Sequence, residues 1–111
     1  MGSYKRLIKN KQFLRLLLQN QNKALINSAT NAELICIYEI VQNFLQGNLS
    51  VNNCKLNKLR KFKKELRLLA NKKISQKKKK KIINQTGGLL ATLATTLIPI
   101  IVNLIMEKLI K

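Results

Sequence analysis

The chain has 111 residues with 22 Lys or Arg against 4 acidic residues, all of them Glu, so its formal net charge is +18; it has neither Asp nor His. Catalytic acid–base groups and metal ligands come mainly from His and Asp, so this composition argues against an enzyme and predicts no cofactor and no metal site. An apolar content of 46% excludes a wholly disordered polycation and predicts a folded core.

The N-terminal part of the chain is predicted to form two helices. Apolar residues at helical spacing predict an amphipathic first helix that ends near Gln19, with an apolar face made of Tyr4, Leu7, Ile8, Leu14, Leu17 and Leu18. A break is predicted at residues 20–22, where Asn and Gln replace the apolar pattern. A short helix over residues 23–28 is expected to follow.

Two longer helices are predicted next. Thr30 and Glu33 form a capping-box pattern at the start of a helix over residues 32–46, which is apolar on most faces and is therefore expected to be central. Gly47 is its predicted end. A further helix is predicted to run without interruption to about Ala70, because apolar residues recur every three or four positions at Leu56, Leu59, Phe62, Leu66 and Leu69.

A last short helix completes the predicted body. Ser75 is expected to cap a helix over residues 76–84, in which Ile82 and Ile83 contact the core while the lysines stay in solvent. No strand pattern competes with these helices. The prediction is an all-α fold, with a small basic helical bundle over residues 1–84.

The two cysteines, Cys36 and Cys54, are too few for a disulfide framework. They also lack the additional Cys or His partners that a zinc site needs. We predict two buried or half-buried free thiols in a reducing compartment.

Basic residues are concentrated in residues 55–81, where 14 of 27 positions are Lys or Arg and Glu65 is the only acid. We predict that they contact the phosphate backbone of double-stranded DNA without specifying sequence, because most are lysines, which lack the bidentate fork of arginine. A lysine-rich solubilising surface is the alternative, and a nuclear-localisation signal at residues 77–81 is compatible with both. The predicted contacts are Lys55, Lys58, Arg60, Lys61, Lys63, Lys64, Arg67, Lys72, Lys73, Lys77, Lys78, Lys79, Lys80 and Lys81.

A glycine-containing hinge is predicted at residues 85–88, followed by a separate hydrophobic, amphipathic helix over residues 89–111 that Pro99 kinks. Its predicted polar stripe contains Thr92, Thr96, Pro99, Asn103 and Glu107. The opposite side holds the predicted membrane contacts Leu93, Leu97, Ile101 and Ile105.

This helix has three open interpretations. It could be an interfacial or lytic helix, since Thr95, Thr96 and Pro99 give a weak similarity to melittin-type peptides. It could be a tail anchor, for which its uncharged stretch is barely long enough. It could also bind a partner or pack on the core.

The order of these features resembles a known family. A basic helical body, a lysine run, Thr86-Gly87-Gly88 and an apolar C-terminal helix are similar to the precursors of small virion core proteins of adenovirus-like double-stranded DNA viruses and of the related Maverick or Polinton transposable elements (adintoviruses). The similarity covers about residues 45–105. It implies a DNA-condensing protein of the virion and host nucleus, which a viral cysteine protease cuts after Gly88. Gln85 departs from the residues usual in that position, and the glycine pair also suits a helix C-cap.

Two functions remain open from the sequence. The first is sequence-independent DNA binding and condensation by a viral core protein, with the C-terminal helix contacting a membrane or a capsid protein. The second is a membrane-active protein whose basic body binds anionic headgroups while residues 89–106 insert. A cellular tail-anchored or toxin-like protein is a third possibility.

Overall fold

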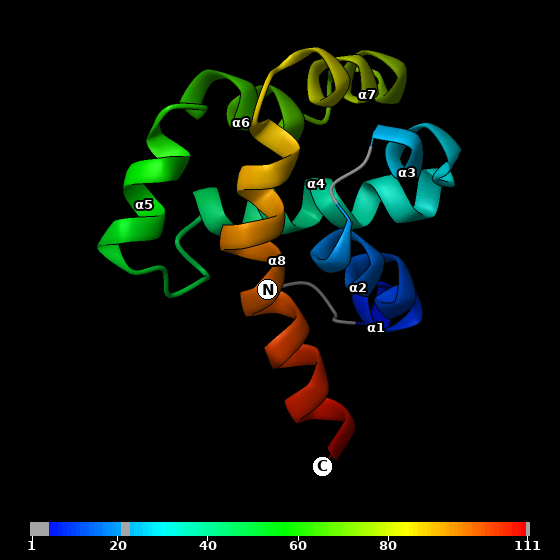
Figure 1. Cartoon of the computed structure of the whole chain (residues 1–111), viewed down its shortest axis with the longest axis vertical. Coiled ribbons are helices and arrows are strands. Elements are labelled where there is room, and N and C mark those ends of the chain that lie inside the picture. Colours follow the sequence, from blue (N-terminus) through cyan, green and yellow to red (C-terminus); the bar gives the residue numbers. More distant parts are fainter. Residues whose placement is uncertain (1–4, 21–22, 111) are drawn as a thin grey trace.

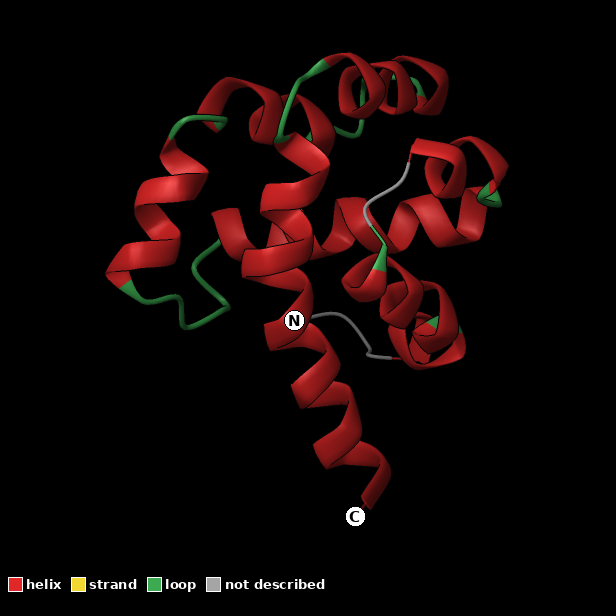
Figure 2. Cartoon of the chain, in the orientation of Figure 1, coloured by secondary structure: helices red, strands yellow, loops and turns green. Residues whose placement is uncertain are grey.

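The computed structural model describes residues 5–20 and 23–110, and their side chains as far as Met106. Within these residues the fold is all-α, as predicted, and contains no strand (Figures 1 and 2). Four predicted features lie outside the described part: Tyr4 of the first apolar face, residues 21–22 of the predicted break, the Glu107 side chain of the polar stripe, and residue 111 of the last helix. The helices are α1 (Lys5–Lys9), α2 (Lys11–Gln19), α3 (Lys23–Ser28), α4 (Asn31–Leu45), α5 (Asn53–Arg60), α6 (Lys63–Ala70), α7 (Gln76–Gln85) and α8 (Leu89–Ile110).

Helix α8 runs through the middle of the molecule, with α4 behind it, α5 on one side and α2 on the other (Figure 1). Residues 89–106 therefore share one core with the preceding helices and do not form a unit apart from residues 1–84. The predicted membrane contacts are each at most 1% exposed within this core: Leu93, Leu97, Ile101 and Ile105. The physical reason is that the shorter helices supply too little apolar surface for a core of their own, and α8 supplies the rest.

The solvent-facing side of α8 differs from the predicted polar stripe. Thr96 is fully buried, and its hydroxyl donates a hydrogen bond of 2.6 Å to the carbonyl oxygen of Thr92. Ala91 and Thr95 are exposed instead, together with Asn103, and the helix continues through Pro99. Because α2, α4 and α5 all contact α8, a wide arc of its surface is covered, including part of the polar stripe.

Two of the predicted helices are each divided in two. Asn10 separates α1 from α2, and its side-chain amide donates a hydrogen bond of 2.9 Å to the carbonyl oxygen of Arg6. Lys61 and Phe62 separate α5 from α6, which lets α5 pack on α8 while α6 packs on α4. The backbone of Lys61 is still helical (φ −62°, ψ −23°). The helical spacing of the apolar residues therefore continues through the turn, and the sequence pattern does not reveal that the helix is divided there.

Several helix ends agree with the predictions. The Thr30 hydroxyl accepts a hydrogen bond of 3.2 Å from the Glu33 amide, and the Glu33 carboxylate accepts one of 2.8 Å from the Thr30 amide. These two bonds complete the capping box of α4. Gly47 follows α4 with a φ of 79°. The Ser75 hydroxyl accepts from the Lys78 amide at 3.2 Å at the start of α7. These signals succeed because each involves residues at most four apart.

The two thiols have different surroundings. Cys36 of α4 is buried, and this burial raises the pKa of its thiol to about 11. Cys54, at the start of α5, is exposed, so the prediction that both thiols are at least half-buried is wrong for it. Its position is explained by the orientation of α5, which buries Leu59 instead.

Candidate nucleic-acid interface

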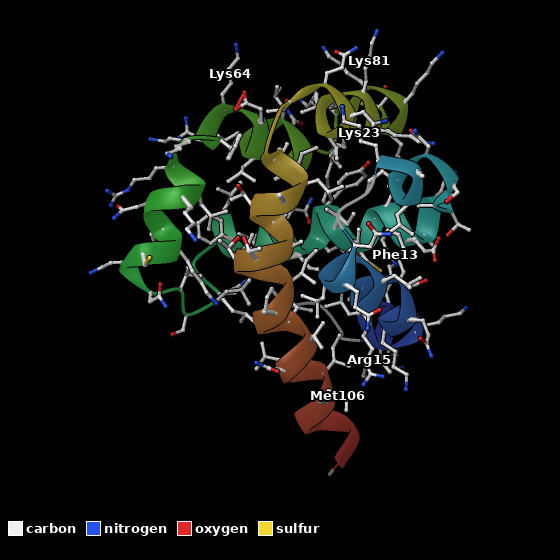
Figure 3. All side chains as sticks on the ribbon, in the orientation of Figure 1. Phe13, Arg15, Lys23, Lys64, Lys81 and Met106 are labelled. Carbon is white, nitrogen blue, oxygen red and sulfur yellow. The ribbon has the colours of Figure 1, made fainter. Side chains whose placement is uncertain are left out.

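Helices α5, α6 and α7 follow one another around the outside of the bundle, and most of the predicted phosphate contacts point outward from them. Figure 3 shows Lys64 of α6 and Lys81 of α7 extending away from the body at the same end of the molecule. We call the 11 exposed basic side chains of this region the basic arc. Its members are Lys58, Arg60, Lys61, Lys63, Lys64, Arg67, Lys72, Lys73, Lys77, Lys78 and Lys81.

The charge of the basic arc is not neutralised within the described part of the protein. The only ion pair found there joins Arg6 to Glu39, which lies outside the arc. Glu33 is used in the capping box of α4, and Glu65 of α6 forms no ion pair with a described residue. Mutual repulsion among the arc's side chains therefore opposes folding, and binding of a polyanion would relieve it.

Two lysines of the run in α7 contact other helices of the bundle. Lys79 is only 6% exposed, and its Nζ lies 4.8 Å from the centre of the Tyr38 ring, so the prediction that the lysines of this helix stay in solvent is wrong for Lys79. Burial lowers the pKa of its ammonium group. Lys80 is half-buried, and its Nζ donates a hydrogen bond of 2.9 Å to the carbonyl oxygen of Asn27 in α3.

The cause is the periodicity of α7. A helix that packs on a core turns one face inward, and positions three or four apart share that face whatever their side chains. Ile83 is buried on the inner face, and Lys79 lies one turn before it. Asn84 adds a hydrogen bond of 2.7 Å to the side-chain oxygen of Asn27, which fastens α7 to α3. The fourteenth predicted contact, Lys55, is half-buried at the start of α5.

One basic residue near this surface lies outside the predicted segment. Lys23 begins α3, is exposed, and lies close to α7 in Figure 3. Helices α3 and α7 are in contact, so Lys23 extends the positive surface beyond the basic arc. No sequence signal could have indicated this, because Lys23 is more than 50 residues before α7 in the chain.

The glycine pair forms a tight turn between α7 and α8. Gly87 and Gly88 are exposed, as cleavage would require, but Gly88 has a φ of 81° and the segment is not extended. The Leu89 amide donates a hydrogen bond of 3.2 Å to the Thr86 carbonyl oxygen, and the Leu89 side chain is buried. A protease could reach the bond after Gly88 only after this turn opened, and cleavage there stays a prediction.

Three further observations bear on what the chain can do. No group of three or more His, Cys, Asp or Glu side chains within the described residues is placed to hold a metal ion. The stretch Leu89–Met106 is long and apolar enough to cross a membrane, but half of it is buried inside the bundle. Comparison of the chain with protein-family models, with curated proteins and with solved structures found no match.

Proposed function

We propose that this protein binds the phosphate backbone of double-stranded DNA without sequence preference, through the basic arc, and condenses the DNA by neutralising it. The observation that supports this most is that 11 exposed cationic side chains lie along three consecutive helices and the segments that join them, and none of them pairs with a described carboxylate. Nine of the 11 are lysines, which act as point charges and favour backbone contacts over the recognition of base edges. Among the described residues, the one hydrogen bond found for these side chains joins Arg60 to Asn57, one turn earlier in the same helix.

The biological setting that we propose is the packaging of a genome in a virus particle, with the particle and the host nucleus as locations. The resemblance to virion core-protein precursors supports this setting. A contact with a capsid protein or a membrane would use the last turns of α8, which extend past the other helices in Figure 1. This contact and processing by a viral cysteine protease belong to the same proposal.

Membrane activity is the weaker candidate. The apolar side of α8 cannot lie in the protein core and in lipid at the same time. Insertion of residues 89–106 would remove the packing surface of α2, α4 and α5 and unfold much of the bundle. Binding of the basic arc to anionic headgroups would need no such change, so vesicle experiments should separate surface binding from leakage.

The test is the salt dependence of DNA binding. Each phosphate contact that is lost reduces the slope of log K against log salt by about 0.9, so Lys64→Gln, Arg67→Gln and Lys81→Gln together should reduce it by about 2.7. Fluorescence anisotropy of labelled duplexes of two unrelated sequences would measure the slope. The two duplexes should bind equally well.

A charge-matched control is available in α1 and α2. Lys9→Gln, Lys11→Gln and Arg15→Gln remove the same charge from α1 and α2, and Arg15 lies far from Lys64 and Lys81 in Figure 3. This triple variant should change the slope by less than about 1. Equal changes in both triple variants would mean that binding follows net charge alone, and the assignment to the basic arc would be wrong.

A further inference from the structure

A half-open pocket of about 320 Å³, lined by polar and apolar residues alike, lies on the inner side of α7, away from the exposed lysines of that helix. It is formed between α1, α4, the segment that precedes α7, and the first turns of α7 itself. Its volume is several times the roughly 30 Å³ that one water molecule takes up in the liquid. Its wall contains the polar residues Arg6, Tyr38, Glu39, Lys72, Gln76 and Lys79.

The ammonium group of Lys79 has no counter-ion within the described residues. Its Nζ lies over the Tyr38 ring, and it forms neither an ion pair nor a hydrogen bond with a described side chain or carbonyl group. An ammonium group has three donors, and a cation contact with a ring satisfies none of them fully. The Lys79 side chain as a whole is only 6% exposed, so little water can reach the ammonium group in place of a carboxylate partner, and an anion in the pocket would offset this loss of hydration.

Two other residues of the wall each have a buried polar atom without a partner among the described residues. The Tyr38 hydroxyl belongs to a side chain that is only 4% exposed, and it has no hydrogen-bond partner among the described residues. Burial raises the pKa of Tyr38 to about 12, so the phenol keeps its proton at neutral pH and can donate. The Oε1 of Gln76 is likewise buried without a partner. Buried donors and acceptors are nearly always paired in folded proteins, so a ligand that supplies partners is expected here.

The pocket carries a net positive charge. Arg6 and Glu39 form an ion pair and cancel each other, so the Glu39 carboxylate does not repel an anion on its own. Lys72 and Lys79 then remain uncompensated. Gln76 and Lys79 also lie in the first turns of α7, where the exposed amide groups and the dipole of a ten-residue helix favour an anion.

We propose that this pocket binds one phosphate group, with Lys79 as its ion-pair partner, the Tyr38 hydroxyl as a hydrogen-bond donor, and Lys72 at the entrance. A phosphate group supplies acceptors to both donors at once, which a chloride ion or a water molecule does less well. A free phosphate or a phosphate monoester can also donate a proton to Gln76, whereas the diester of a DNA backbone has only acceptors. The proposal does not depend on the DNA binding proposed above.

The test uses the full-length, ¹⁵N-labelled chain in a buffer without phosphate. Sodium phosphate is titrated against sodium chloride of equal ionic strength, and backbone amide shifts are followed by NMR. Phosphate should cause saturable shifts at Tyr38, Gln76 and Lys79 that chloride does not cause. Shifts that are non-saturable or confined to the exposed lysines would overturn the proposal.

Two substitutions in the pocket sharpen the test. Tyr38→Phe keeps the ring and its contact with Lys79 but removes the hydroxyl, and it should weaken phosphate binding about 10-fold. Lys79→Met should weaken it by at least about 10-fold, while Lys9→Met, which removes the same charge from the exposed end of α1, should leave it unchanged. Unchanged affinity in folded Tyr38→Phe would mean that phosphate binds elsewhere.

The source of the phosphate is distinguished in a second titration with a short DNA duplex. If the duplex shifts the same amides and competes with inorganic phosphate, the ligand is a backbone phosphate. If inorganic phosphate alone shifts them, the ligand is a small phosphate compound, and this result would stand even if DNA did not bind to the basic arc. If neither shifts them, the proposal is wrong.

Discussion

Helix α8 and the basic arc are the two segments of most extreme composition, one almost without charge and the other almost without acids, and the fold accounts for only one of them. The apolar side chains of α8 fill the core, so their abundance is explained by folding stability. The charges of the basic arc form no ion pair in the described part of the molecule, and Arg60 has only the neutral side chain of Asn57 as a hydrogen-bond partner. An unusual segment indicates an external ligand only when the fold leaves its distinctive side chains unused.

The same criterion divides the lysine run of α7. Lys79 and Lys80 contact Tyr38 and Asn27 within the bundle, whereas Lys77, Lys78 and Lys81 remain exposed. A run that looks uniform in the sequence therefore contains side chains with two different environments. Only the exposed ones belong with the proposed DNA contacts, and Lys79 belongs with the pocket.

The largest expected effect tests whether α8 is a core helix. Leu97→Ala removes a fully buried side chain from the middle of the helix and should lower the free energy of unfolding by about 2 to 5 kcal/mol. Urea denaturation followed by circular dichroism would measure it. Thr95→Ala, on the exposed side of the same helix, should change the stability by less than about 0.5 kcal/mol. If the two substitutions had equal effects, α8 would not be packed in the core in solution, and the membrane hypothesis would regain support.

A smaller effect is expected at the connection between the two contrasted regions. Gly88→Ala places a side chain at a φ of 81° and should cost about 1 to 2 kcal/mol of stability. Gly87→Ala is the matched control, because its φ is not positive and no atom lies within 4 Å of the added methyl group. The same denaturation experiment applies. Equal costs would indicate a loose hinge, which would suit proteolysis better than the tight turn does.

The smallest effect is expected in the basic arc. Each of the substitutions Lys64→Gln, Arg67→Gln and Lys81→Gln should change the free energy of unfolding by about 0.5 kcal/mol or less. At low salt the triple variant should be more stable than the parent chain, because repulsion among the remaining charges decreases. Denaturation at low and high salt would show this, since salt screens the repulsion in the parent chain. A loss of more than about 2 kcal/mol would mean that these side chains hold the fold together, and their charge would no longer need an external partner.

The local sequence by itself determined the helical class and several helix ends. Thr30 with Glu33, Gly47 and Ser75 act on backbone groups at most four residues away, so their effect could be predicted without knowing the fold. The same holds for the accumulation of positive charge between residues 55 and 81. Composition and short-range spacing contain this information completely.

Only the tertiary structure decided which sides of the helices are buried. The burial of Lys79 depends on Tyr38, some 40 residues earlier, and the burial of Thr96 depends on the several helices that surround α8. The turn at Lys61 and Phe62 likewise exists because α5 and α6 pack on different partners. Burial is a property of contacts between distant segments, and periodicity within one segment reports only that a helix has two sides, without saying what will cover each.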